Sequence, residues 1–440
     1  MKITTQRAWT AGALAAVVGV ACGMSAQPPA AEKTSGYTRV VEKDDGSLAL
    51  EIASKTFVPE GGKPGPKIHL VGAVHIADKP FYTSLQTMLD AADLVLFEGV
   101  KPPGAGAFDV TLDDAGKVKA TQARLKFLLS VIEEERGRTG KLPESLQQAV
   151  DDAGKRWKTM IASSLTDAWG RPIAYAVAEP ETGGQKAVVT SFGPNGADDE
   201  GKADDVRLEG KTAPKKKGEK DAGLQAKMAD ALGLTFQLDA MDSSKANWRS
   251  SDMSMDELQA RFEAAGVESD QLLKMLDGSS LMGKLASMLL GIVKSSPQLA
   301  ATLKLTMVDL LGSENAMAAG PAEMKKMMDV ILVDRNDVVL KDIRSVLDNE
   351  KRKDIAVFYG AGHLPDMEMK LKRDFGYAYE GEQWIEAISV SPKAAGMTPA
   401  QAKRMRETMR KQLERQAETE RVKAEKAKRK KDEAAQPAEK

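Results

Sequence analysis

The sequence has few of the residues that usually mark cross-links or reactive sites. It contains one cysteine and three histidines in 440 residues, and aromatic residues make up only 5%. A single cysteine excludes an internal disulfide, so packing must hold the fold together. The remaining composition, 42% hydrophobic and 29% charged, is ordinary for a globular protein that can bury at least one large core.

The N-terminal segment is typical of a secretory signal peptide. Basic residues precede a small apolar run, Ala8 to Ala21, which is shorter than the roughly 20 residues of a membrane span. The run ends at Cys22, and "GVAC" resembles a bacterial lipoprotein cleavage site without its usual leucine. Either Cys22 carries a lipid anchor or it is removed with the signal. In both cases we expect a secreted or periplasmic protein, held at a membrane only through such an anchor.

Two of the three histidines occupy the same place in a repeated octet. "VGAVHIAD" (71–78) and "YGAGHLPD" (359–366) both follow an apolar run. A strand that ends in glycine lets the chain turn tightly, and the residue beyond it lies at the carboxyl edge of a parallel sheet. We therefore expect His75 and His363 to meet at that edge. His69 falls within a strand and is interpreted as structural.

The alternation of strand and helix patterns predicts an α/β fold, with a mixed, mostly parallel sheet and flanking helices. "KIHLVGAVHI", "KPFYTSLQTMLDAA" and "DLVLFEG" read as strand, helix and strand, a βαβ unit with parallel pairing. From Leu224 the chain is mostly helical, and "SMDE" (254–257) is a capping-box pattern that opens one helix. A strand, "DIAVFYGAGH", a helix and a closing strand, "WIEAISV", follow.

Glu98 ends its strand at the position that matches the two histidines. Two imidazoles and one carboxylate are a common ligand set for a catalytic divalent metal with an open position for water. We therefore predict that His75, Glu98 and His363 hold a divalent transition metal; manganese, cobalt and zinc remain alternatives. Asp78 and Asp366, three residues after each histidine, are expected to orient the imidazoles.

At these residues the chain resembles the TraB/PrgY/TIKI family, which includes GumN-like proteins. The resemblance covers roughly 49–101 and 224–390 and implies a fold akin to erythromycin esterase. It also implies that His75, Glu98 and His363 are metal or catalytic residues of a metal-dependent hydrolase that cleaves peptide or ester bonds. "DRN" (334–336) is similar to the family's Glu-Arg-Asn element, with Asp in place of Glu. Arg335 is thereby a candidate catalytic residue that binds a substrate carboxylate or an oxyanion.

The segment between the two octets resembles the soluble part of type II secretion major pseudopilins (GspG-like). The marks are "TGKLP", "DAWGRP" and "SFGPNGADDEGKADD", and the family's long apolar N-terminal helix is missing beside them. The acidic loop offers oxygen ligands for calcium, or else is simply solvated. The candidate calcium ligands are Asn195, Asp198, Asp199, Asp204 and Asp205.

The expected units are a signal peptide (1–26), a first TraB-like half (46–101), the insert (120–208), a second TraB-like half (224–392) and a charged helical tail (398–440). The polar stretch 237–254 is expected near the mouth of the site. Residues 401–440 carry 14 Lys+Arg against 8 Asp+Glu, a net charge of 14 − 8 = +6. Because the tail has no aromatic residue and its charges alternate in sign, nucleic-acid binding is not expected.

A second interpretation stays open. The chain could be a non-catalytic protein that binds a ligand or another protein, with the insert making the partner contacts. Related folds bind haem, and either His75 or His363 could then be an axial ligand.

Overall fold

The computed structural model describes residues 36–102, 104–105, 112–153, 155–180, 184–212, 224–266, 289–312 and 327–435. The expected signal peptide and Cys22 lie outside these ranges. Within them, every helix is either too short or too polar to cross a bilayer.

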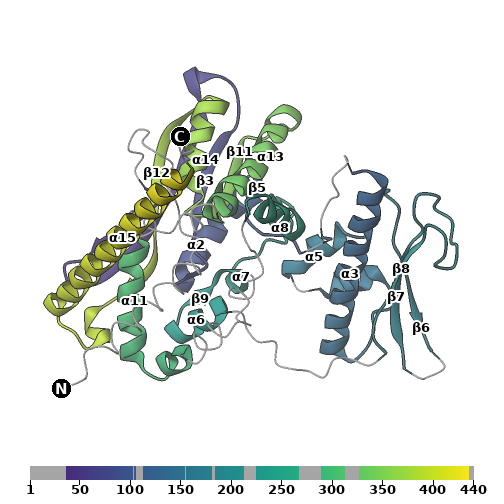
Figure 1. Cartoon of the computed structure of the whole chain (residues 1–440), viewed down its shortest axis with the longest axis horizontal. Coiled ribbons are helices and arrows are strands. Elements are labelled where there is room, and N and C mark those ends of the chain that lie inside the picture. Colours follow the sequence, from purple (N-terminus) through teal and green to yellow (C-terminus); the bar gives the residue numbers. More distant parts are fainter. Residues whose placement is uncertain are drawn as a thin grey trace, which may run out of the picture.

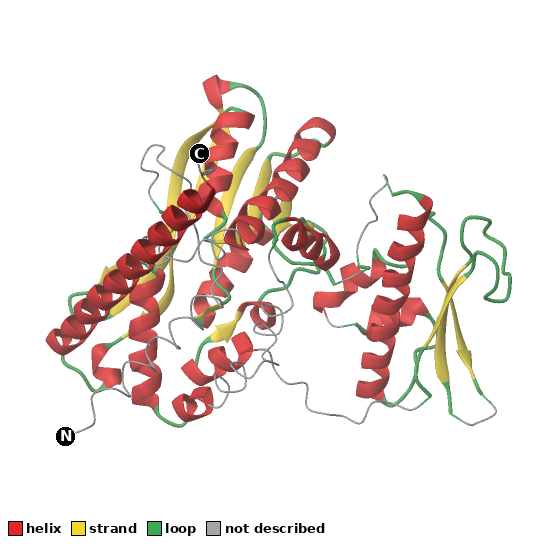
Figure 2. Cartoon of the chain, viewed as in Figure 1, coloured by secondary structure: helices red, strands yellow, loops and turns green. Residues whose placement is uncertain are grey.

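The larger unit is built on a seven-stranded mixed sheet (Figures 1 and 2). Four neighbouring strands are parallel, in the order β3, β11, β5 and β10, and β1, β2 and β12 pair antiparallel beside them. The prediction of an α/β fold with a mixed sheet and flanking helices is confirmed at this level. The strands are β1 (Thr38–Glu42), β2 (Leu48–Pro59), β3 (Lys67–Ala73), β5 (Leu94–Phe97), β10 (Trp248–Ser250), β11 (Asp354–Gly360) and β12 (Tyr377–Val390).

The strand order corrects one sequence prediction. The βαβ unit joins β3 to β5 through α2 (Lys79–Asp90), but these two strands do not pair with each other. Instead β11, which comes more than 250 residues later in the chain, lies between them and is parallel to both. Ala356 pairs with His69 on one side and with Val95 on the other. Consequently the two octets end adjacent strands, and Glu98 follows the next strand along.

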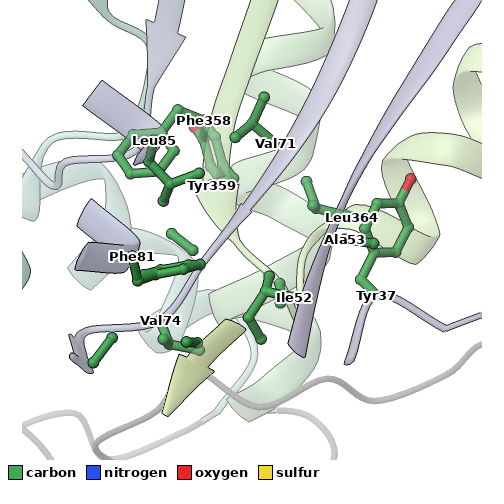
Figure 3. Close-up of a cluster of buried hydrophobic side chains, with 14 of the residues drawn as sticks. Tyr37, Ile52, Ala53, Val71, Val74, Phe81, Leu85, Phe358, Tyr359 and Leu364 are labelled. Carbon is green, nitrogen blue, oxygen red and sulfur yellow. The ribbon is translucent and has the colours of Figure 1, made fainter. Parts of the chain in front are cut away.

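The core of this unit lies where helices pack against the sheet. The α2 helix buries Phe81, Tyr82, Leu85 and Leu89. Figure 3 shows Phe81 and Leu85 in one cluster with side chains of β2, β3 and β11, among them Ile52, Val71 and Phe358. β3 and β11 are mostly runs of buried apolar residues, as expected for parallel strands covered on both faces, whereas β2 also buries the polar side chains of Ser54 and Lys55.

The other helices follow the expected order with some changes of boundary. The capping box is confirmed: Ser254 accepts from the N–H of Glu257, and the Glu257 side chain accepts from the N–H of Ser254. The helix over 327–349 is interrupted near its start by a π-helical turn. The remaining elements of this unit are η1 (Glu60–Gly62), β4 (Ile76–Ala77), α6 (Leu224–Leu232), β9 (Thr235–Phe236), α7 (Gln237–Ala240), α8 (Met255–Ala264), α11 (Pro297–Leu311), η2 (Val330–Asp334, the π turn), α13 (Arg335–Asn349), α14 (Leu364–Phe375), η3 (Pro392–Ala395) and α15 (Pro399–Ala435).

The insert forms a separate α+β unit that stands to one side in Figure 1. A three-stranded antiparallel sheet, in the order β6, β7 and β8, packs on α3 and has its own apolar cluster. In "DAWGRP" (167–172), Asp167 accepts from the N–H groups of Trp169 and Arg171. The elements are α3 (Asp114–Thr139), α4 (Leu146–Asp152), α5 (Lys155–Ala162), β6 (Ala174–Ala178), β7 (Lys186–Ser191) and β8 (Val206–Glu209).

Candidate functional site

The three residues predicted as metal ligands lie past the carboxyl ends of three consecutive parallel strands. His75 is in the bend after β3, His363 precedes the first residue of α14 after β11, and Glu98 directly follows β5. They are close enough for both imidazoles to act electrostatically on the Glu98 carboxylate. The strand order therefore brings together side chains that lie up to 288 positions apart in the sequence.

Glu98 is the centre of this arrangement. Its Oε1 atom accepts from Nη2 of Arg335 at 2.7 Å, and its Oε2 atom accepts from the backbone N–H of Gly360 at 2.7 Å. The same Oε1 lies 3.5 Å from Nε2 of His363. Burial alone would raise the pKa of Glu98, but the charge of Arg335 holds this pKa well below its usual value. Glu98 is thus a carboxylate at neutral pH.

Gly360 has a geometric reason to be glycine. A Cβ atom at this position would lie 3.2 Å from Oε2 of Glu98 and 3.7 Å from Cδ2 of His363. Without it, the carboxylate can approach the backbone N–H closely. The glycine of the second octet therefore makes room for the third member of the site.

Arg335 holds two carboxylates from the start of α13. Its Nε and Nη2 atoms donate to Asp252 at 2.9 and 2.7 Å, in addition to the bond from Nη2 to Glu98. Burial would lower the pKa of Arg335, but the two carboxylates raise it above its usual value. Among the described residues, Nη1 has only a 3.4 Å contact with the carbonyl of Ile331. In this arrangement Arg335 positions Glu98, and only Nη1 is left to meet the expected substrate carboxylate or oxyanion.

The π turn η2 directly precedes Arg335. π-helical turns change the direction of the residues that follow them and occur frequently at functional sites. Here the turn lies next to the residue that joins α13 to Glu98.

His363 is held through its other ring nitrogen. The side chain is 1% exposed, and its Nδ1 atom lies 2.8 Å from Oδ1 of Asn336. The ring of Tyr359 packs edge-on against the imidazole, with centroids 5.2 Å apart. Asp366, expected to orient His363, accepts instead from Nδ2 of Asn336 at 2.8 Å. Its effect on the imidazole is therefore indirect, through Asn336.

His75 is half-buried and is held by residue Gln237. The backbone N–H of Gln237 donates to the carbonyl of His75 at 2.8 Å, and a hydrogen bond joins the two side chains. Burial lowers the pKa of His75, an effect that the charge of Glu98 partly offsets. Asp78, expected to orient this ring, accepts from the N–H of Ser389 at 2.9 Å and so ties the start of α2 to β12.

Three residues of the site had no role predicted from the sequence: Asn336, Asp252 and Gln237. Asp252 and Gln237 belong to the stretch 237–254, which was placed near the site mouth on its polar character alone. Asn336 is the last residue of "DRN", where only Arg335 was given a function. The remaining histidine, His69, makes contacts within the sheet region, with Thr56 at 3.0 Å and Asp354 at 3.3 Å.

The donor atoms fit a divalent cation in part. Two ligands bound tetrahedrally at 2.0–2.1 Å are about 3.3 Å apart, close to the 3.5 Å between Oε1 of Glu98 and Nε2 of His363. Asn336 holds the far side of the His363 ring, as the outer partner of a metal ligand does, and the Gly360 N–H holds the far oxygen of Glu98. Arg335, in contrast, donates to the same Oε1 atom that faces His363. Among the described residues, however, no group of three His, Cys, Asp or Glu side chains is arranged so that it could hold a metal ion.

The acidic loop of the insert presents one unsatisfied oxygen. Oδ2 of Asp205 accepts from the N–H groups of Asp199 and Gly201, each at 2.9 Å. Oδ1 of Asp205 is buried without a partner among the described residues. An unpartnered carboxylate oxygen is costly to bury unless a cation or donor meets it. That atom fits the predicted calcium site.

Asn195 and Asp198 fit the calcium site less well than predicted. Asn195 turns its amide nitrogen to the loop, with Nδ2 donating to Asp199 at 2.9 Å and to Asp204 at 2.7 Å. Its Oδ1 accepts from the N–H of Ala197 at 2.6 Å. Asp198 is exposed and accepts from the N–H of Glu200. Both oxygens of Asp204 also accept from Asn195, so Oδ1 of Asp205 is the oxygen that the loop leaves free among the described residues. As described, the carboxylates of the loop do not form a group of three that could hold a metal ion.

Comparisons with known proteins do not assign this chain to a family. No protein-family model matches this chain, and neither the curated proteins nor the solved structures include a significant match.

Proposed function

We propose that this protein is an extracytoplasmic metal-dependent hydrolase of peptide or ester bonds, with His75, Glu98 and His363 as the metal ligands. The observation that supports the proposal is the convergence of two imidazoles and a carboxylate past the ends of three neighbouring parallel strands. This edge is where α/β sheets place their sites. The resemblance to the TraB/PrgY/TIKI family and its erythromycin-esterase-like fold supports the same assignment.

A bound divalent metal would supply a water of lowered pKa and would polarise a carbonyl. The side chains of the protein have separate roles. Glu98 stays ionised because Arg335 compensates its charge. His363 presents Nε2 to the site because Nδ1 faces Asn336. His75, whose pKa is lowered by burial, stays neutral and keeps a lone pair for coordination.

The decisive experiment is elemental analysis of the purified protein beside a His75→Ala/His363→Ala double variant, with hydrolysis of peptides and esters measured on both. Metal near one equivalent in the wild type, lost together with hydrolysis in the variant, is the expected result. His69→Ala is the matched control, because His69 lies within β3 and contacts Thr56 and Asp354 instead of the site. Equal metal content in the wild type and the double variant would overturn the proposal.

We further propose that the insert is a pseudopilin-like module that binds calcium and contacts a partner protein. Its support is the separate α+β core and the unpartnered Oδ1 of Asp205. Calcium as the metal that persists in the double variant would favour the second interpretation, a binding protein whose insert makes the contacts.

A further inference from the structure

Asn336 lies between the buried imidazole of His363 and the start of α14, and its amide makes three polar contacts there. Nδ2 lies 3.0 Å from the carbonyl oxygen of His363 and 2.8 Å from Oδ2 of Asp366. Oδ1 lies 2.8 Å from Nδ1 of His363. Asn336 itself is fully buried. An amide enclosed in this way has its orientation set by its neighbours.

The partners of Nδ2 determine which end of the amide is the NH2 group and which is the oxygen. A backbone carbonyl can only accept, so the atom that faces the carbonyl of His363 must be the NH2 group. Asp366 is kept as an acceptor by Lys370, whose Nζ lies 2.9 Å from the same Oδ2. With the NH2 group directed at both of these acceptors, the oxygen of Asn336 must face His363.

It follows that Nδ1 of His363 carries the hydrogen. An amide oxygen has no proton to give, so a 2.8 Å contact with it is favourable only if the ring nitrogen donates. The neutral imidazole is then the Nδ1–H form, and the lone pair is on Nε2. That atom is the one that lies 3.5 Å from Glu98.

We propose that Asn336 is a positioning residue that locks His363 in the Nδ1–H tautomer, so that Nε2 is the only nitrogen of this ring available to the site. Asp366 and Lys370 act behind Asn336 by fixing its orientation. The inference concerns the site of the proposed hydrolase, but it makes a claim about the protein that can be tested without any substrate.

The test is nuclear magnetic resonance of protein labelled with ¹⁵N-histidine and freed of metal by a chelator. With three histidines in the chain, long-range ¹H–¹⁵N correlation resolves the tautomer of each ring, and His69→Gln and His75→Gln variants assign the signals. We expect His363 to show a protonated Nδ1 and an unprotonated Nε2, the reverse of the form that free neutral histidine prefers. A protonated Nε2 with a bare Nδ1 in the wild type would overturn the proposal.

Two variants test whether Asn336 is the cause. Asn336→Leu removes the acceptor and is expected to shift His363 toward the Nε2–H form, with metal affinity or activity about 10–100-fold lower. Asn336→Asp keeps an acceptor and is expected to keep the Nδ1–H form. Asn349→Leu is the control, since Asn349 is exposed on the same helix and donates only to the carbonyl of Ser345. An unchanged tautomer in Asn336→Leu would refute the role of Asn336.

The outcomes separate this inference from the proposed function. An Nδ1–H ring in a protein that neither binds a transition metal nor hydrolyses any substrate would leave the tautomer lock intact and overturn the hydrolase. An Nε2–H ring in a protein that binds a transition metal and hydrolyses a substrate would overturn the tautomer lock and leave the hydrolase intact. If Asn336→Leu does not fold, the wild-type spectrum and Asn336→Asp still decide the question.

Discussion

Arg335 donates from Nη2 to Oε1 of Glu98 at 2.7 Å, and the two side chains are only 8% and 15% exposed. The same nitrogen lies 2.7 Å from Asp252, whose side chain is fully buried. One guanidinium therefore compensates two carboxylates inside the protein. Removing a single partner from a buried ionic group leaves uncompensated charge, which costs far more than breaking an ion pair at the surface.

We expect Arg335→Met to lower the free energy of unfolding by about 3–5 kcal/mol, because Glu98 and Asp252 would both remain buried without their cation. The measurement is chemical denaturation. Arg249→Met is the control: Arg249 pairs with Glu350, but their side chains are 44% and 26% exposed. Its loss should stay below about 1 kcal/mol. Similar losses for the two variants would show that the Arg335 network is not acting as a buried charge cluster.

The depressed pKa of Glu98 predicts a pH dependence of stability. A carboxyl group whose pKa is lower in the folded than in the unfolded state stabilises the fold above its unfolded pKa, here close to 4.5. This contribution is lost as the pH falls from 4.5 through the folded pKa. We expect the difference in unfolding free energy between wild type and Glu98→Gln to be largest near neutral pH and to shrink on acidification. A difference that grows below pH 4.5 would contradict the assigned direction of the shift.

The position of the site could be predicted from the sequence, because its three candidate ligands each follow a short apolar run. Glu98 directly follows β5, and His75 and His363 come two and three residues after the ends of β3 and β11. All three strands are buried along most of their length. A strand end of this kind is a local feature, so it can be recognised from the sequence alone. The structure shows a separate α+β unit in the insert, while its likeness to pseudopilins stays a prediction.

The strand order and the partners of the ligands could not be predicted in the same way. Nothing in the sequence near β3 or β5 indicates that β11 enters between them, since this pairing depends on contacts far along the chain. Asn336 meets a residue 27 positions away, and Arg335 meets Asp252 across 83 positions. A rule based on spacing selected Asp78 and Asp366 as orienting residues. In the fold, His75 instead has a side-chain hydrogen bond with Gln237, and Asn336 lies between Asp366 and His363.

Gly72 and Gly360, the glycines of the two octets, are needed for different reasons. Substitution by alanine should therefore affect stability at one position and the site at the other. A Cβ on Gly72 would lie 2.6 Å from Cγ2 of Ile52 and 2.8 Å from the carbonyl oxygen of Ala53. We expect Gly72→Ala to destabilise the protein by about 1–3 kcal/mol, since β2 must move to admit the methyl group. Thermal or chemical unfolding measures this loss.

Gly360→Ala should act mainly on the site. Its Cβ would meet only side-chain atoms, at 3.2 Å from Oε2 of Glu98 and 3.7 Å from His363. A carboxylate displaced by a few tenths of an ångström weakens the bond from the Gly360 N–H, so metal affinity and hydrolysis should fall more than stability does. The reverse ranking, with Gly360→Ala the more destabilising and Gly72→Ala the less active, would contradict this division.

Calcium should stabilise the insert through Asp205. Oδ1 of Asp205 is buried without a described partner, while Oδ2 is held by two backbone N–H groups, so the carboxylate is already oriented. Binding to the folded state raises stability by about 2.7 kcal/mol when free calcium is 100 times its dissociation constant. We therefore expect the melting temperature of the insert to rise with calcium and to return to its initial value with a chelator.

Two aspartate variants test which carboxylate carries this effect. Asp205→Asn should abolish the calcium-dependent rise, because it removes the charge at the unsatisfied oxygen. Asp198→Asn should preserve it, because Asp198 is exposed and its Oδ1 accepts from the N–H of Glu200. Calorimetric titration of both variants with calcium gives the dissociation constants directly. Equal weakening by the two substitutions would mean that the loop attracts calcium only by its overall charge, and the oriented Asp205 carboxylate would then have no special role.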